Sequence, residues 1–191
     1  MREHRAEGRT ALLVIDMQNS YFDFPELEEQ RESVTEKVNE LIRCARGAGC
    51  PILLIRTQHE RDRSTWTVNM QDDDQGFAYP GTEQAEYVAG LDTEDGVGLV
   101  KTRDSAFFDT DLAARLRNLG VSHLVLCGIS THSCVAQTAI DAFAHNFRAA
   151  VARDAVASEN PDLSRALLAF LEHEMRQDVL HQADALARLE G

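Results

Sequence analysis

Basic residues are scarce in this sequence relative to acidic ones. The 191 residues include 19 Lys and Arg against 32 Asp and Glu, which gives a formal net charge of −13 at pH 7. Nucleic acids and anionic membrane surfaces are bound through basic faces. The charge therefore argues against both as partners and is typical of a well-solvated protein surface.

Long apolar runs and secretory features are also missing. No stretch of the sequence approaches the roughly 20 apolar residues that a membrane-spanning helix needs. The first residues, 1–10, are charged and lack the apolar centre of a secretory signal. The sequence therefore predicts a cytoplasmic protein with no membrane partner.

Cysteine is rare, and no C-x-x-C pair is present, which argues against a zinc ribbon or a thioredoxin-like site. Free thiols are expected in a cytoplasmic chain of this size. Cys44 and Cys50 fit packing positions in and after a helix, and Cys127 lies in an apolar run. Cys134 has different surroundings, because it follows an apolar run and opens a helical pattern.

Apolar runs alternate with amphipathic helical patterns along the chain. Strands are expected at 11–15, 51–57, 97–101, 123–127, 148–153 and 178–181. Helices are expected over about 32–48, from Asp109 or Thr110 to Gly120, from about Cys134, and from Pro161. The alternation predicts an α/β fold: a three-layer α-β-α, Rossmann-like domain with a mainly parallel sheet of about six strands. We expect one domain over 1–191, with its core at about 10–185.

Three further local features are expected. The residues 128–133 read as a tight turn, and the residues 58–93 as a long irregular connection with a short helix near 83–88. A connection of this length is a candidate substrate lid or oligomer contact. Two helices should bury one apolar face each, made of Val135, Thr138, Ala139, Ala142 and Phe143 in one and of Leu163, Ala166, Leu167, Phe170 and Leu171 in the other.

Three chemically reactive side chains follow three of the predicted strands. Asp16 comes directly after the first strand, Lys101 ends the third, and Cys134 lies just past the fourth. The carboxyl ends of parallel strands share one edge of the sheet, and ligands of open α/β sheets bind there. Topology alone is therefore expected to bring the three residues together.

Their chemistry is complementary. A thiolate is the attacking form of cysteine, and both a helix N-terminus and the Lys101 ammonium group favour the thiolate. The Asp16 carboxylate could accept the thiol proton and deliver it to a leaving amine. Each residue also has a plain alternative, namely a helix cap or loop residue for Asp16, a solvent-facing charge for Lys101 and inert packing for Cys134.

Several motifs resemble the isochorismatase-like cysteine hydrolases, a superfamily that includes nicotinamidases, N-carbamoylsarcosine amidases and ureidoacrylate amidohydrolases. The resemblance covers about 10–185, and its motifs occur in the family's order. They are Leu13-Val14-Ile15-Asp16-Met17-Gln18, Lys101-Thr102-Arg103-Asp104-Ser105-Ala106-Phe107, Thr110-Asp111-Leu112, Gly128-Ile129-Ser130-Thr131-His132-Ser133-Cys134-Val135 and Asp154-Ala155.

The resemblance implies a base at Asp16, a cation at Lys101 that stabilises the thiolate, and a nucleophile at Cys134. It also implies a cis peptide bond between Ile129 and Ser130, with the N–H groups of Ser130 and Cys134 forming an oxyanion hole. The reaction would be hydrolysis of a small amide or ureido substrate through a thioester, without a cofactor. A homo-oligomer, dimer or tetramer, is expected on the same ground.

Candidate substrate-binding residues lie near these motifs and in the long connection. They are Gln18, Phe22, Trp66, Phe107 and Ile129. Gln18 has two possible roles, support of the Asp16 side chain or a structural role at the strand end. Core packing is an equal alternative for Phe22 and Phe107, whereas the polar surroundings of Trp66 favour a pocket or an oligomer contact.

The metal-binding nicotinamidases carry an Asp-x-His after the second strand, with another His downstream. This chain has Thr57-Gln58-His59 there and no further His before Lys101, so no metal is expected. His59 is then a polar residue of the pocket or surface, and His132 has the same two possible roles.

Two other functions remain open. Relatives that cleave the vinyl ether of isochorismate generally lack the cysteine, so an ether hydrolase would use Asp16 as an acid and leave Cys134 incidental. A non-catalytic binding protein on the same fold is the other alternative.

Overall fold

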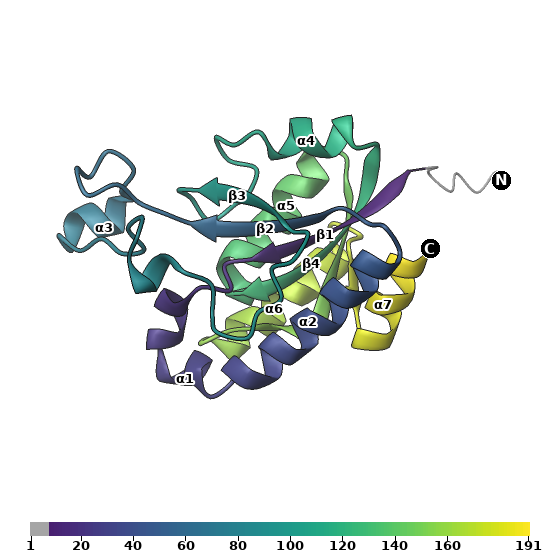
Figure 1. Cartoon of the computed structure of the whole chain (residues 1–191), viewed down its shortest axis with the longest axis horizontal. Coiled ribbons are helices and arrows are strands. Elements are labelled where there is room, and N and C mark those ends of the chain that lie inside the picture. Colours follow the sequence, from purple (N-terminus) through teal and green to yellow (C-terminus); the bar gives the residue numbers. More distant parts are fainter. Residues whose placement is uncertain (1–7) are drawn as a thin grey trace.

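The computed structural model describes residues 8–191, so most of the charged N-terminal stretch 1–10 lies outside the described residues. Its centre is a single sheet of six strands in the order β3-β2-β1-β4-β5-β6 (Figure 1). Every neighbouring pair is parallel. The strands are β1 (Arg9–Ile15), β2 (Ile52–Thr57), β3 (Val97–Lys101), β4 (Val121–Ile129), β5 (Arg148–Ala157) and β6 (Asp178–Leu180). The predicted α/β fold with a parallel six-stranded sheet is confirmed.

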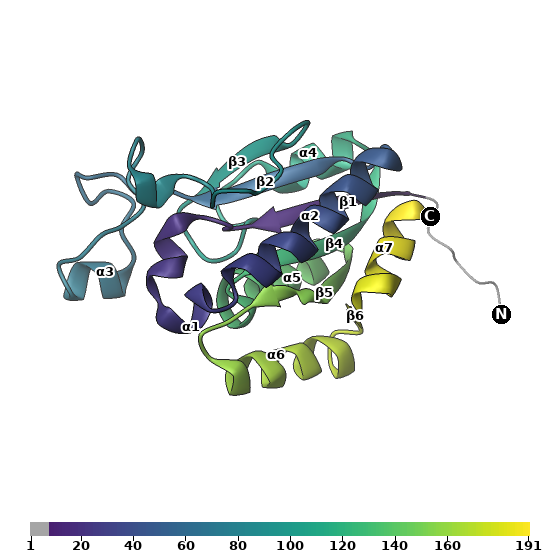
Figure 2. The ribbon, with the colours of Figure 1, turned by 60° about the horizontal axis from the view of Figure 1, so that its bottom comes forward.

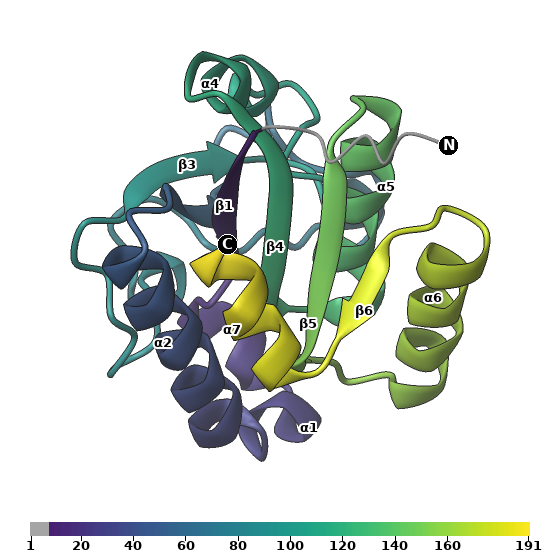
Figure 3. The same cartoon turned by 90° about the vertical axis from the view of Figure 1, so that its right-hand side faces the viewer.

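Helices cover both faces of this sheet, which gives the three layers (Figure 3). The helices are α1 (Pro25–Glu28), α2 (Arg31–Gly47), α3 (Val68–Asp72), α4 (Leu112–Asn118), α5 (Ala136–Ala144), α6 (Pro161–His173) and α7 (Gln182–Glu190). Side chains alternate between the two faces of β1. Leu12 and Val14 pack in one core cluster with α2 and α7, and Leu13 and Ile15 pack in the other with α4 and α5.

The strand order reverses between β1 and β4. The chain runs from β1 outward through β2 to β3, and then returns to β4 on the other side of β1. This reversal is the switch point at which open α/β sheets bind ligands. The segments after β1 and β4 both leave the sheet there, so Asp16 and the turn that carries Cys134 follow the ends of two adjacent strands.

The turn expected at 128–133 is different in the structure. β4 continues to Ile129 because Gly128 and Ile129 pair with Val156 and Ala157 of an equally extended β5. The next residues form a single helical turn, η3 (Thr131–Val135), which leads into α5. Three helices were not foreseen at all, namely α1, α3 and α7, and the first two of them are only four and five residues long.

The two predicted apolar helix faces are only partly buried. Phe143 of α5 is 50% exposed, although Ala139 and Ala142 beside it are buried. In α6 only Leu171 is buried, whereas Leu163 and Phe170 are 43% and 40% exposed. The reason is position, since α6 lies alongside the edge strand β6 and not over the middle of the sheet (Figure 3).

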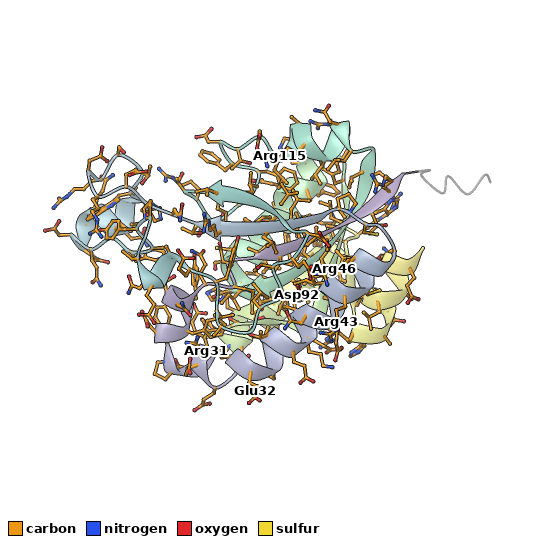
Figure 4. All side chains as sticks on the ribbon, in the orientation of Figure 1. Arg31, Glu32, Arg43, Arg46, Asp92 and Arg115 are labelled. Carbon is orange, nitrogen blue, oxygen red and sulfur yellow. The ribbon has the colours of Figure 1, made fainter. Side chains whose placement is uncertain are left out.

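The long connection after β2 is more ordered than the sequence suggested. It holds α3 and the short turn η2 (Glu83–Ala85), and α3 projects beyond the carboxyl ends of β2 and β3 (Figures 1 and 2). Its returning part is fastened to the segment after β1, where Val88 N donates to Met17 O at 2.9 Å. Further on, Asp92 pairs with Arg46 of α2 at 2.7 Å (Figure 4). No helix within residues 8–191 is long and apolar enough to cross a bilayer.

Candidate active site

Asp16, Lys101 and Cys134 meet at the carboxyl edge of the sheet. Lys101 Nζ lies 2.7 Å from Asp16 Oδ2 and 3.3 Å from Cys134 Sγ. The side chains of Asp16 and Lys101 are 0% and 1% exposed, and Cys134 is 2% exposed. The structure therefore brings together all three residues that were named from their positions at strand ends.

Glycine at position 128 allows β1 and β4 to approach at this point. Gly128 pairs with Ile15 and has a φ of +112°, and a Cβ atom built on it would lie 2.0 Å from Ile15 O. The residue directly after β1, Asp16, has a φ of +51°, in the left-handed region that non-glycine residues adopt infrequently. The chain turns sharply there, and its N–H is held by Ile55 O at 2.9 Å.

Thr57 is a member of the site that the sequence reasoning did not include. Its hydroxyl accepts a hydrogen bond from Lys101 Nζ at 2.8 Å and donates to Asp16 Oδ1 at 3.1 Å. Tyr21 OH donates to the same hydroxyl at 3.1 Å. Thr57 ends β2, which lies between β1 and β3, so the rule that selected Asp16 and Lys101 would also have selected it.

The nucleophile candidate sits in a tight helical turn. Ser133 N and Val135 N both donate to Ser130 O at 3.2 Å, and the second of these bonds spans five residues, as in a π-helix. Single turns of this type are frequent at functional sites. The peptide bond between Ile129 and Ser130 is cis, the isomer that the resemblance implies. Thr131 Oγ1 fastens the turn to Ala157 O of β5 at 2.9 Å.

His132 belongs to a polar cluster that supports this turn. Its Nδ1 lies 2.8 Å from Ser158 Oγ, and its Nε2 lies 3.6 Å from a carboxylate oxygen of Glu159. The other oxygen of Glu159 accepts a hydrogen bond from Ser130 Oγ at 2.8 Å. These contacts give His132 a structural role next to the reactive residues.

Burial dominates the electrostatics of the sulfur. It raises the pKa of the Cys134 thiol; Lys101 opposes this, but Asp16 and Asp104 add to it. For Lys101, burial alone would lower the pKa, but the negative partners Asp16 and Cys134 outweigh burial and raise it. Burial thus opposes formation of a thiolate at Cys134, whereas the nearby lysine favours it, as the sequence suggested.

Asp104 is a second carboxylate at the sulfur, also missed from the sequence. Its Oδ1 lies 3.8 Å from Cys134 Sγ, and its Oδ2 accepts a hydrogen bond from Gln137 Nε2 at 2.9 Å. Asp104 is exposed, unlike the three buried reactive residues. It lies inside one of the motifs that carry the resemblance, but no strand ends there, so its position alone gave no signal.

Gln18 takes the structural role of the two that were considered. Its Nε2 donates to Thr57 O and to Ala85 O, both at 2.9 Å, and its Oε1 accepts from Thr57 N at 2.7 Å. The side chain is fully buried, and its bonds join the end of β2 to the returning connection. No hydrogen bond to the Asp16 carboxylate is found among the described residues, so support of Asp16 is indirect, through Thr57.

The four apolar candidates for substrate binding are buried by packing contacts. Phe107 stacks on Phe147 with ring centroids 5.8 Å apart, and the Arg31 guanidinium lies 4.6 Å from the centre of the Phe22 ring. Ile129 is fully buried in the core on the side of α2 and α7. Their role in substrate binding stays a prediction.

Trp66 is buried, although it lies in a polar part of the sequence. It is only 6% exposed, and its Nε1 donates to Glu60 O at 2.9 Å within the long connection. Gly76 lies against its ring, since a Cβ on that glycine would be 2.5 Å from a ring carbon. The long connection buries Trp66 in packing of its own, and its expected role in a pocket or an oligomer contact stays a prediction.

His59 is buried, and its surroundings do not suit a metal ion. Its Nδ1 lies 3.0 Å from Thr65 O, and burial lowers its pKa. Thr57 offers a hydroxyl where the metal-binding relatives are expected to carry a carboxylate. Residues 8–191 contain no group of three or more His, Cys, Asp or Glu side chains placed to hold a metal. The donor set present here therefore does not fit a zinc or iron centre.

A surface hollow lies close to the nucleophile turn but does not open on the sulfur. It has a volume of about 340 Å³, and Thr131, Ser158 and residues of α6 line it. Asp16, Lys101 and Cys134 are not among its lining residues. All three side chains are almost completely buried.

A parallel α/β sheet with reactive side chains at its carboxyl edge defines a class of enzymes that bind small ligands at a topological switch point. Comparison with known proteins identifies the family within this class. The model of the isochorismatase domain matches residues 10–183, and the chain therefore belongs to the isochorismatase family of hydrolases.

Relatives and solved structures agree with this assignment. A probable inactive nicotinamidase of Arabidopsis thaliana is 34% identical over 166 residues, which cover 82% of this chain and 85% of the relative. The ureidoacrylate amidohydrolase RutB of Caulobacter vibrioides is 28% identical, with 84% and 82% covered. The crystal structure of an isochorismatase family protein from Desulfovibrio vulgaris superimposes with a TM-score of 0.83 at 30% identity, covering 94% of this chain and 99% of that one.

Proposed function

We propose that this chain is a cysteine-dependent hydrolase that cleaves a small amide or ureido C–N bond through a thioester acyl-enzyme. Cys134 is the nucleophile, Asp16 the proton carrier and Lys101 the cation that stabilises the sulfur. The supporting observation is that Lys101 Nζ contacts both Asp16 Oδ2, at 2.7 Å, and Cys134 Sγ, at 3.3 Å. One ammonium group thereby connects the base to the nucleophile.

The first step joins sulfur to the carbonyl carbon. Burial raises the pKa of the thiol, so its proton must leave as the S–C bond forms, and the Asp16 carboxylate, which Lys101 links to the sulfur, is assigned to receive it. Lys101 stays charged and offsets the negative charge that develops on sulfur. Asp16 then returns the proton to the nitrogen as the C–N bond breaks, which releases ammonia or an amine and leaves a thioester on Cys134.

The second step is hydrolysis of that thioester. Asp16 takes a proton from water as the water oxygen bonds to the acyl carbon, and it passes that proton to sulfur as the S–C bond breaks, which restores the thiol and releases the acid. In both steps, the N–H groups of Ser130 and Cys134 are assigned to the carbonyl oxygen as it becomes an oxyanion. A donor in such a position contributes roughly 3–4 kcal/mol in well-studied hydrolases. No step requires a metal.

The names of the relatives support amide chemistry but also mark an alternative. RutB is a ureidoacrylate amidohydrolase, whereas the Arabidopsis relative is named a probable inactive nicotinamidase. The buried lysine between a carboxylate and a thiol favours catalysis over a non-catalytic role, because removing charged groups from water costs free energy. A vinyl-ether hydrolase would not need the sulfur.

An ammonia-release screen over small primary amides and ureido compounds tests the function. Cys134→Ala should lose turnover, and Cys44→Ala, which removes a half-buried thiol from α2, should keep it. Mass spectrometry of the wild-type protein during turnover should show an acyl group on the Cys134 peptide. Ammonia release by Cys134→Ala at the wild-type rate would exclude the sulfur mechanism, and isochorismate cleavage by that variant would favour the ether hydrolase.

We also propose a cytoplasmic homo-oligomer, a dimer or a tetramer. The exposed apolar side chains of α5 and α6, namely Phe143, Leu163 and Phe170, support it, because exposed apolar side chains are available for association. Sedimentation velocity at several protein concentrations checks the oligomeric state, and Phe170→Glu should shift the protein toward the monomer if α6 takes part.

A further inference from the structure

The carboxylate of Asp104 faces the nucleophile from the solvent side of the site. One oxygen lies 3.8 Å from Cys134 Sγ, and the other is held by Gln137 Nε2 of α5 at 2.9 Å. Asp104 is exposed, and it forms no ion pair with any residue in 8–191. Its negative charge is therefore uncompensated at the place where a substrate meets the sulfur.

The two cationic side chains of this segment, Lys101 and Arg103, interact with groups other than Asp104. The Lys101 ammonium group is matched by the Asp16 carboxylate at 2.7 Å. The Arg103 guanidinium donates to the carbonyl oxygens of Thr65 and Thr102, both at 2.7 Å, and so binds the long connection. Asp104 is thus a carboxylate next to the sulfur that pairs with no Lys, Arg or His side chain of residues 8–191.

The carbonyl carbon of a substrate must come within about 3–3.5 Å of the sulfur before attack. At that distance, the carbonyl carbon and the Asp104 carboxylate both contact Cys134 Sγ. A substituent on the side of the scissile carbonyl that faces Asp104 can then reach this carboxylate, which can only accept a hydrogen bond when ionised.

We propose that Asp104 is a specificity-determining residue that selects substrates with an N–H or ammonium group beside the scissile carbonyl and disfavours substrates with a carboxylate there. This inference rests on the proposed function and narrows its substrate class to neutral ureido compounds and amino amides. A carboxylate at that place would face Asp104 as a like charge, and like charges repel.

The rival explanation is structural, because the Asp104–Gln137 hydrogen bond also ties the segment after β3 to α5. Two variants separate the explanations. Asp104→Asn removes the charge and keeps an oxygen and an amide of the same shape, whereas Gln137→Ala removes the tie and keeps the charge. A structural role predicts similar effects of both variants on all substrates alike.

Three amides of similar size test the proposal at pH 7. Glycinamide carries an ammonium group next to the amide, propionamide carries a methyl group, and malonamate carries a carboxylate. In the wild type, kcat/KM should be highest for glycinamide and lowest for malonamate. Asp104→Asn should shift the glycinamide-to-malonamate ratio by about tenfold toward malonamate, and Gln137→Ala should change the ratio less than twofold while lowering all three rates alike. An unchanged ratio in Asp104→Asn, or equal shifts in both variants, would overturn the inference.

Alkylation of the thiol gives a second readout that does not depend on hydrolysis. The rate of labelling of Cys134 by neutral iodoacetamide, divided by the rate with anionic iodoacetate, should fall about tenfold in Asp104→Asn and stay constant in Gln137→Ala. If the wild type alkylates with this charge preference but releases ammonia from no amide or ureido compound, the proposed function fails and the role of Asp104 at the sulfur stands. If ammonia is released and both ratios are insensitive to Asp104→Asn, only the role of Asp104 fails.

Discussion

The hydroxyl of Thr57 lies 2.8 Å from the ammonium group of Lys101, and this contact joins the carboxyl ends of two adjacent strands, β2 and β3. The same oxygen is 3.1 Å from Asp16 Oδ1, at the end of β1. Three strand ends are thus linked through one hydroxyl, which donates to the carboxylate and accepts from the ammonium group. The hydroxyl fixes how the charged pair is presented to the sulfur.

Replacing Thr57 by Val should weaken both activity and stability. The substitution keeps the shape but leaves one hydrogen-bonding site of Lys101 and one of Asp16 without a partner, at a cost of about 1–3 kcal/mol for a buried group. We expect kcat/KM for ammonia release to fall about tenfold or more and the free energy of unfolding, measured by urea denaturation, to fall by about 2 kcal/mol. Thr57→Ser keeps the hydroxyl and should recover most of the activity. A fully active Thr57→Val protein would show that the hydroxyl is not needed.

The fold and the three reactive residues could be predicted because they depend on local patterns and on one topological rule. Short apolar runs such as 11–15 and 51–57 are typical of buried strands, and the carboxyl ends of parallel strands share one edge. Asp16 and Lys101 were found in this way. Thr57 also ends a strand, but a threonine hydroxyl is neither charged nor strongly nucleophilic, so it gave no functional signal in the sequence.

Other features depend on contacts between distant segments, which periodicity does not show. Trp66 lies in a polar stretch and is nevertheless buried, because Gly76 and the segment around Glu60 close over it. The apolar pattern of α6 correctly indicated a helix, but it could not show that this helix lies at the sheet edge, where Leu163 and Phe170 remain exposed. The raised pKa of Cys134 reflects its burial, which opposes the effect of the lysine that the sequence revealed.

Replacing Gln18 by Leu should loosen the long connection without touching the reactive residues directly. The substitution leaves Thr57 N, Thr57 O and Ala85 O without their side-chain partner in a buried place. We expect the free energy of unfolding to fall by about 3 kcal/mol, since each buried unsatisfied group costs about 1–3 kcal/mol. Limited proteolysis should show faster cleavage within 58–93.

Asn19→Ala is the matched control for Gln18→Leu. Asn19 also donates from its side chain to the returning connection, at Glu83 O, but this bond is exposed to solvent. Its loss should cost less than about 1 kcal/mol because water replaces the partner. Equal stability losses in the two variants would contradict the importance of burial at Gln18.

Replacing Gly128 by Ala should be among the most damaging single-methyl additions in the protein. The new Cβ would lie 2.0 Å from Ile15 O, and the φ of +112° is unfavourable for any residue with a side chain. We expect a loss of about 4 kcal/mol or more in the free energy of unfolding, together with loss of activity, because the switch point between β1 and β4 must widen.

Gly98→Ala, in the edge strand β3, is the comparison for Gly128→Ala. No atom lies within 4 Å of a Cβ built at Gly98, and its φ is not positive. Its unfolding free energy should stay within about 0.5 kcal/mol of the wild type. A Gly128→Ala protein as stable as Gly98→Ala would mean that β1 and β4 tolerate separation at this point.

Stability should decrease as the pH falls from 7.5 to 5.5, in part because of His59. Burial lowers the pKa of His59 below its ordinary value of 6.5. Below pH 6.5, His59 therefore binds a proton in the unfolded chain but stays neutral in the folded protein. The free energy of unfolding decreases as the pH is lowered, until the pH reaches the folded-state pKa of His59. For one proton, the slope is at most about 1.4 kcal/mol per pH unit.

His59→Gln should flatten this part of the stability curve, measured by urea denaturation at pH 7.5, 6.5 and 5.5. An amide at position 59 can still donate to Thr65 O but does not titrate. Some slope must remain, because burial also lowers the pKa of His123. His173→Gln, at an exposed position in the last turn of α6, should leave the curve as in the wild type. Burial of His59 near Lys101 and Arg103 opposes its protonation in the folded protein. If the stability curve of His59→Gln runs parallel to that of the wild type, His59 has the same pKa in the folded and unfolded protein, and the prediction fails.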